Sequence, residues 1–129
     1  MKITKSFFAN DQEFNLMKRK GIFPYDYLDS EDRLKETELP RQSKFFNKLT
    51  NEACSLEDYE HAQNVWTSFD CKSLLDYLLL YLKTDVLLLS DIFENFRKLC
   101  KNIYYLDPCQ YYTAPGLSWE AMLKITKYN

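Results

Sequence analysis

The sequence predicts a mainly α-helical chain with one long central helix, flanked by shorter helices and loops. Three observations support this fold class. Only two of the 129 residues are glycine, Gly21 and Gly116, which leaves few sites for the tight turns of an antiparallel sheet. Helical periodicity persists from residue 73 to about residue 103. Three segments begin with a cap residue that is followed three positions later by an acidic residue.

Composition and charge indicate a globular domain and argue against a free-standing nucleic-acid-binding protein. Apolar residues make up 46% and charged residues 28% of the chain, which is typical of one globular domain. The chain has a net charge of −2, whereas a free-standing nucleic-acid-binding protein usually has an excess of basic residues. Residues 18–20 form a small basic cluster. We therefore expect any contact with DNA to be made as part of a larger protein.

The cysteines and the longest apolar run indicate a reduced, soluble, intracellular protein with no membrane partner. Cys54, Cys71, Cys100 and Cys109 have spacings that match no zinc signature, and the chain has one histidine. The apolar run at residues 77–82 is too short to cross a bilayer, and no signal peptide is visible.

The first helix is expected over residues 11–19, capped by Asn10 in a capping box and ended by Gly21. Phe14 and Met17 would face the interior. Residues 21–54 are expected to be an irregular, acidic and solvated stretch, with a short helix around residues 43–49.

A second helix is expected over residues 56–68, capped by Ser55. His61 lies in its middle, and a lone histidine without co-ligands is more often structural than a metal ligand. The third helix begins after Ser73 and continues to about Ile103. The last helix is expected over residues 118–128.

One face of the third helix has a carboxylate in an otherwise apolar row. The row reads, in steps of three and four, Leu75, Leu78, Leu82, Asp85, Leu89, Ile92, Phe96, Leu99 and Ile103. This periodicity predicts a buried stripe. An ionised carboxylate in such a place requires a basic partner, hydrogen-bond donors or a metal ion. A structural ion pair and a position at the solvent edge of the stripe are the alternatives to a catalytic role.

Tyr81 lies one turn before Asp85, and the two form the pattern Tyr-x-x-x-Asp. This pattern resembles the third exonuclease motif of family B DNA polymerases. Four longer blocks resemble the protein-primed polymerases of Polinton/Maverick-type mobile elements and related organellar and viral enzymes. They are KGIFPYDYLDS (residues 20–30), EDYEHAQNVW (57–66), YLKTDVLLLSDIFENFR (81–97) and LDPCQYYTAPGLSWEAMLK (106–124).

The resemblance implies roles for three residues. Asp85 matches one of four carboxylates that hold two divalent metals, Mg²⁺ or Mn²⁺, in a 3′→5′ proofreading site. Tyr81 matches the tyrosine that orients the attacking water. Lys20 fits the Lys-x-x-hydrophobic pattern of a catalytic lysine upstream of this motif in protein-primed polymerases, and its alternative role is a helix-end cation that faces the dipole.

The resemblance also implies the origin of the chain, which would be cut from an α/β ribonuclease-H-like domain. Residues 1–105 would be the C-terminal part of the exonuclease domain, and residues 106–129 the start of the connection to the polymerase domain. The partners of the intact parent would be single-stranded DNA 3′ ends and a terminal protein primer. The first and second exonuclease motifs and the polymerase motifs are absent from the sequence. The isolated chain is therefore expected to bind no metal and to be inactive.

Two other interpretations stay open. The stripe on the third helix could form the seam of a free-standing helical interaction module, in which Asp85 selects the register. The chain could also be a non-functional remnant of a mobile element whose exposed stripe promotes self-association.

The tyrosines of residues 104–112 could stack on DNA or pack against the long helix.

Overall fold

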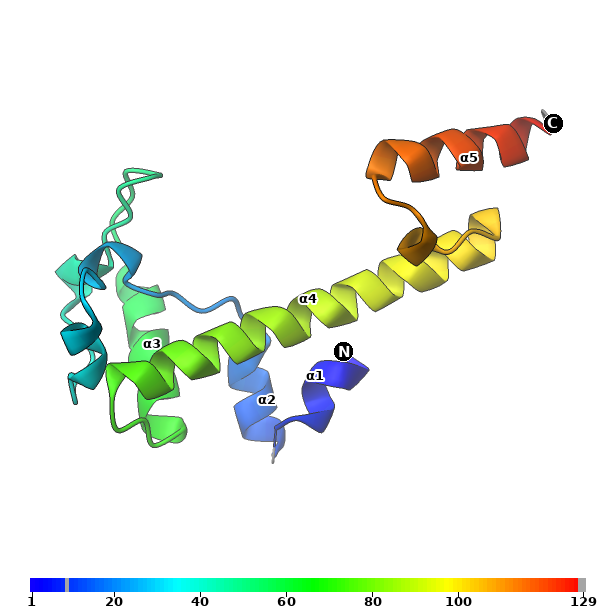
Figure 1. The fold of residues 1–129 in the computed structure, drawn as a ribbon. Coiled ribbons are helices and arrows are strands. Elements are labelled where there is room, and N and C mark those ends of the chain that lie inside the picture. The colour runs from blue at the N-terminus through cyan, green and yellow to red at the C-terminus, as the bar shows by residue number, and fades with distance from the viewer. Residues whose placement is uncertain (9, 128–129) are drawn as a thin grey trace. The chain divides into compact units, whose positions relative to one another are not determined.

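The computed structural model describes residues 1–8 and 10–127. The α-helices are α1 (Lys2–Ser6), α2 (Asp11–Met17), α3 (Leu56–Ser68), α4 (Leu74–Tyr104) and α5 (Ala114–Thr126). The 3₁₀ helices are η1 (Tyr25–Tyr27), η2 (Glu31–Lys35), η3 (Gln42–Phe45) and η4 (Pro108–Gln110). Within the described residues there is no β-strand, only an isolated bridge between Asn47 and Glu52. The predicted mainly helical fold with a long central helix is confirmed (Figure 1).

Side-chain caps explain where the predicted helices begin. The Glu13 amide donates to the Asn10 side chain at 2.8 Å, and the Asp58 amide donates to the Ser55 hydroxyl at 3.1 Å. At the start of α4, Ser73 accepts from the Asp76 amide at 3.3 Å. These bonds satisfy amides that have no partner within the helix.

Two predicted boundaries need correction, and one helix was not predicted. Helix α2 ends at Met17, before Gly21 is reached. Helix α5 begins at Ala114 because the Thr113 hydroxyl caps it by accepting from the Gly116 amide at 3.2 Å. The predicted end of the last helix at residue 128 lies outside the described residues. The short helix expected near residues 43–49 is η3, and α1 adds one turn at the start of the chain.

The chain divides into two compact units, Met1–Leu88 and Leu89–Asn129, and α4 contributes residues to both. In the first unit, α2, α3 and the start of α4 enclose a core that also includes Phe23 from the segment after α2. The predicted functional division at residues 105 and 106 stays a prediction. No helix in the described part of the chain is long and apolar enough to cross a membrane.

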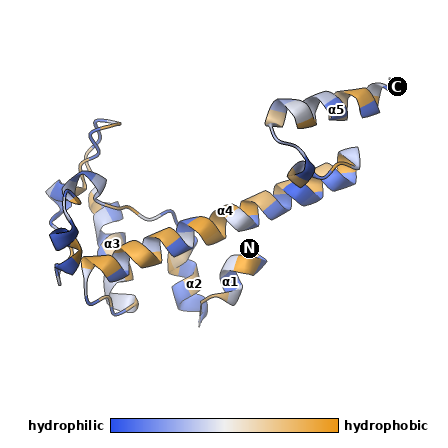
Figure 2. Ribbon diagram, in the orientation of Figure 1, coloured by the Kyte–Doolittle hydropathy of each residue, from blue (hydrophilic) through white to orange (hydrophobic). Residues whose placement is uncertain are grey.

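The buried face of α4 is not the predicted one. The predicted row is largely exposed; its exposed members are Leu75, Leu82, Leu89, Ile92, Phe96, Leu99 and Ile103. The adjacent row is buried instead, and in the first unit it consists of Leu74, Tyr77, Tyr81, Thr84 and Leu87. Both rows consist largely of aliphatic or aromatic side chains in the first unit, and orange prevails over the first half of α4 (Figure 2). Helical periodicity could therefore not decide between them.

The second unit has its own small core. Cys100 of α4, Leu106, and Leu117 and Ala121 of α5 are buried together, with Tyr104 and Tyr111 packed against them. The larger apolar side chains of α5, Trp119, Met122 and Ile125, are exposed.

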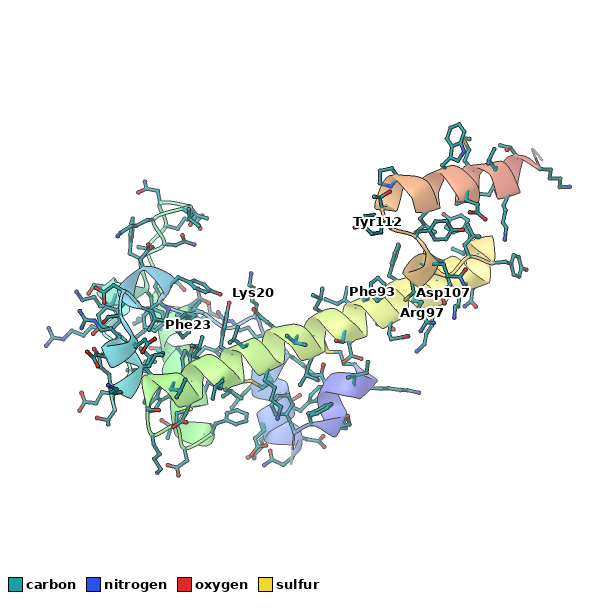
Figure 3. The ribbon with its side chains drawn as sticks, viewed as in Figure 1. Lys20, Phe23, Phe93, Arg97, Asp107 and Tyr112 are labelled. Carbon is teal, nitrogen blue, oxygen red and sulfur yellow. The ribbon has the colours of Figure 1, made fainter. Side chains whose placement is uncertain are left out.

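An ion-pair network joins η4 to α4 in the second unit. The Arg97 guanidinium donates to both carboxylate oxygens of Asp107, with contacts of 2.8 and 3.1 Å, and Lys101 lies 2.9 Å from the same carboxylate (Figure 3). Asp107 also accepts from the Cys109 amide at 3.1 Å. The hydrogen bonds from Arg97 and Lys101 hold the pKa of Asp107 well below its usual range.

The corrected face of α4 can be tested with two neighbouring leucines. Leu74 is 0% exposed and Leu75 is 41% exposed. We expect Leu74→Ala to lower the free energy of unfolding of the chain by about 2–4 kcal/mol because it leaves a cavity. Leu75→Ala should cost less than about 1 kcal/mol, since its methyl groups already contact water. Urea denaturation followed by circular dichroism measures the free energy of unfolding of both variants. A larger loss for Leu75→Ala than for Leu74→Ala would mean that the row containing Leu75 is the buried one.

Candidate functional site

Tyr81 and Asp85 lie one turn apart on α4, in the part of the helix that packs against α2 and α3. Tyr81 is 9% exposed, and Asp85 is half-buried. The sequence prediction that the two side chains share one region of the helix is confirmed, since both line the same small pocket. Their roles are not decided by this placement.

Aromatic rings and one hydroxyl hold Tyr81 in place. The Tyr25 hydroxyl donates to the Tyr81 hydroxyl at 3.0 Å, and the Phe23 ring centroid lies 5.6 Å from that of Tyr81. On the other side the backbone of Gly21 approaches closely, because a Cβ at this position would lie 3.4 Å from the Tyr81 ring. Burial, the hydrogen bond with Tyr25 and the nearby Asp85 carboxylate raise the pKa of Tyr81 well above its usual value. Tyr81 therefore keeps its proton at neutral pH.

The small pocket beside Asp85 has a volume of about 20 Å³, and Arg19, His61 and Thr84 are among the residues that line it. This volume is enough for about one water molecule. Arg19 is engaged elsewhere: its guanidinium contacts Glu57 at 2.8 Å and also pairs with Asp58. In the described part of the chain, Asp85 forms no ion pair with a lysine or arginine. The structural ion pair considered for Asp85 is therefore not formed here.

His61 of α3 shares this pocket with Asp85. Its Nε2 atom is buried and has no hydrogen-bond partner among the described residues. Burial, followed by the positive charge of Arg19, lowers the pKa of His61, while Asp58 opposes the shift. The imidazole is thus predominantly neutral at pH 7. The sequence predicted a structural role for His61 and gave no sign that it lies near Asp85. The fold brings the two residues to one pocket.

Lys20 lies in the segment that follows α2, as does Phe23 further along the chain (Figure 3). It is three residues beyond the last residue of α2, outside the helical turn over which the dipole acts. Lys20 and Tyr81 line the same pocket, of about 250 Å³. The structure therefore brings all three predicted site residues into one region of the first unit, with Tyr81 common to both pockets.

Sequence reasoning missed other residues of the larger pocket. Tyr25 is 62% exposed and Phe46 is 39% exposed, and both line it. Tyr25 belongs to a block that resembles the family, but Phe46 comes from the stretch expected to be irregular. Phe46 and Tyr81 are too far apart in the sequence for any local spacing to relate them. Tertiary folding alone brings them to one pocket.

The donor set is incomplete for a metal centre. Asp85 offers a carboxylate of suitable chemistry at a polar pocket. Within residues 1–8 and 10–127, however, no group of three or more His, Cys, Asp or Glu side chains could hold a metal ion. The described residues do not by themselves form a metal site.

The tyrosines of residues 104–112 differ in their burial. Tyr104 and Tyr111 pack against the core of the second unit. A hydrogen bond with Glu120 and then burial raise the pKa of Tyr111 to about 12. Tyr105 and Tyr112 are exposed, so packing accounts for only part of this stretch.

Alkaline pH should destabilise the chain through Tyr81. A raised folded-state pKa means that the stabilisation from the neutral phenol is present below pH ~10 and is lost as the pH rises above it. Tyr81→Phe removes the hydroxyl and should reduce this pH dependence, at a cost of about 1 kcal/mol at pH 7 for the lost hydrogen bond. Part of the dependence should remain, because burial also raises the pKa of Tyr77. Urea midpoints at pH 7 and above pH 10 measure both effects. Tyr105→Phe, at an exposed position, is the control, and an equal effect of the two variants would contradict the prediction.

We compared the chain with known proteins to identify its family. A family model described as DNA polymerase type B, organellar and viral, matches residues 2–129. Neither curated proteins nor solved structures gave a significant match. The family match covers nearly the whole chain and includes Lys20, Tyr81 and Asp85. The chain therefore belongs to the organellar and viral type B DNA polymerases.

Proposed function

We propose that this chain supplies the third exonuclease motif of a 3′→5′ proofreading site in a protein-primed type B DNA polymerase. The observation that carries the proposal is the placement of Asp85, half-buried beside Tyr81 on α4 and without a basic ion-pair partner in the described residues. A half-buried carboxylate that has no basic partner can accept a cation as a ligand. The family match to residues 2–129 supports this assignment.

In this proposal Asp85 is one ligand of a pair of Mg²⁺ or Mn²⁺ ions whose remaining ligands come from exonuclease motifs that this sequence lacks. Such ions stabilise the attacking and leaving oxygens of a phosphodiester. Tyr81 contributes a protonated hydroxyl, fixed by Tyr25 at 3.0 Å, that can hold the attacking water in position. Lys20, which lines the adjoining pocket, would contact a DNA phosphate.

The isolated chain should show no nuclease activity, because one carboxylate cannot hold two metal ions. Incubation of the purified chain with labelled single-stranded DNA and Mg²⁺ or Mn²⁺ measures this. Metal-dependent digestion that disappears in Asp85→Ala would contradict the inactivity of the chain. In an intact polymerase carrying this segment, Asp85→Ala should lower 3′→5′ exonuclease activity by about 100-fold or more and spare polymerisation. Glu60→Ala, an exposed carboxylate of α3, is the control.

The exposed side chains of α4 favour a second candidate function, a helical interaction segment that associates with a second copy of the chain. In the second unit Leu89, Ile92, Phe96, Leu99 and Ile103 are each exposed by 44% or more. They follow the steps of three and four that characterise a coiled-coil seam. Apolar rows of this kind are seldom left in water.

Self-association should therefore depend on this row. Ile92→Lys should shift the chain towards the monomer in sedimentation velocity at high micromolar concentration, because it places a charge in the seam. Asn95→Lys adds the same charge to an exposed position outside the row and should leave the association unchanged. A chain that is monomeric at every concentration would exclude this candidate.

A further inference from the structure

The small pocket beside Asp85 contains a buried polar atom of α3 that no described protein group satisfies. The Nε2 atom of His61 is buried and has no hydrogen-bond partner among the described residues. Leaving a buried polar atom unpaired costs free energy, and in native proteins such atoms are paired with protein groups or with ordered water. The pocket that His61 shares with Asp85 is therefore suited to a small ligand that forms hydrogen bonds.

The fold holds His61 at this pocket from both sides along α3. Arg19, which follows α2, pairs with Glu57 and Asp58 in the first turn of α3. His61 comes four residues after Glu57, so it lies one turn further along the same face of the helix. Val65, one turn beyond His61, is buried and lines the same pocket. The position of the imidazole is thus set by an ion pair before it and by apolar packing after it.

Asp85 is the group in the pocket that can complete a link to His61. Thr84 also lines the pocket, but its hydroxyl already donates to the Leu80 carbonyl at 2.8 Å. Arg19 is engaged by its ion pairs with α3. An ionised carboxylate has about four acceptor sites, so Asp85 can accept a further hydrogen bond. The pocket volume of about 20 Å³ suits one water molecule and no larger ligand.

We propose that one buried water joins His61 to Asp85: the His61 Nε2–H donates to the water, and the water donates to the Asp85 carboxylate. The Nε2–H tautomer gives the water oxygen a donor, and the carboxylate, which only accepts, takes a proton of the water. His61 is then a positioning residue that fixes the orientation of the Asp85 carboxylate. The consequence for catalysis rests on the proposed proofreading role, because the outer hydrogen-bond partners of a metal-binding carboxylate orient it for the ion.

Nuclear magnetic resonance of the purified chain, without divalent metal, tests the link directly. Rotating-frame NOEs should connect a long-lived water to the methyl groups of Val65, which are buried at the pocket. The nitrogen chemical shifts of His61 should show protonation at Nε2 at pH 7.

Variants of the two partners should change this water signal in a graded way. His61→Leu and Asp85→Leu each remove one partner of the water and should abolish the NOE to Val65. Asp85→Asn keeps an oxygen that can accept and should retain the NOE. Gln63→Leu changes an exposed position of α3 and is the matched control, which should also retain it.

In an intact polymerase carrying this segment, His61→Leu should raise the Mg²⁺ concentration for half-maximal exonuclease activity by about 10- to 100-fold. His61→Gln has an amide that can still donate to the water, so it should recover most of this loss. A merely structural role of His61 would lower the activity without changing its dependence on Mg²⁺. Polymerisation by the same variants reports whether they are folded.

Three results would overturn the proposal: no NOE between water and Val65 in the unaltered chain, an NOE that persists in Asp85→Leu, or an imidazole protonated at Nδ1 alone. The first and third do not depend on any variant folding. If only the water link is wrong, the NOE is absent while Asp85→Ala still abolishes exonuclease activity in the polymerase. If only the proofreading role is wrong, the NOE is present while Asp85→Ala spares the exonuclease.

Discussion

Two tyrosine hydrogen bonds attach the segment after α2 to α4, and the rest of the first unit depends on this attachment. The Tyr77 hydroxyl donates to the Ile22 carbonyl at 2.8 Å, and the Tyr25 hydroxyl donates to the Tyr81 hydroxyl at 3.0 Å. Phe23 fills the space between them. These two bonds fix the path of the backbone between Ile22 and Tyr25 and so shape the pocket in front of Tyr81.

Helix α4 has two apolar rows with different roles. One row, which includes Leu74 and Tyr77, packs against the chain's own helices, and the adjacent row, which includes Leu75 and Leu82, faces water. Asp85 lies between these environments, half-buried and next to Tyr81. A carboxylate there can reach a ligand while its helix stays anchored by the buried row, which is the geometry that a shared metal site would require.

The second unit is stabilised by a different balance of forces. Its core is small, with Cys100, Leu106, Leu117 and Ala121 as its buried members. The paired contacts of Arg97 with Asp107 add to the stabilisation that this small core provides, because they hold the connection that leads from α4 to α5. Bidentate geometry of this kind is among the more specific ion pairs available at a partly exposed position.

The sequence by itself determined where three helices begin and how two residues of the motif are spaced. Short-range capping by Asn10, Ser55 and Ser73 set where three helices begin, because the cap and the amide it satisfies are three residues apart. The spacing of Tyr81 and Asp85 likewise placed them together, since one helical turn separates them. Only the tertiary structure decided which row of α4 is buried, because both rows are apolar and the choice depends on α2 and α3. It also decided that Lys20, Tyr25 and Phe46 meet at Tyr81, since no local periodicity links residues so distant in the chain.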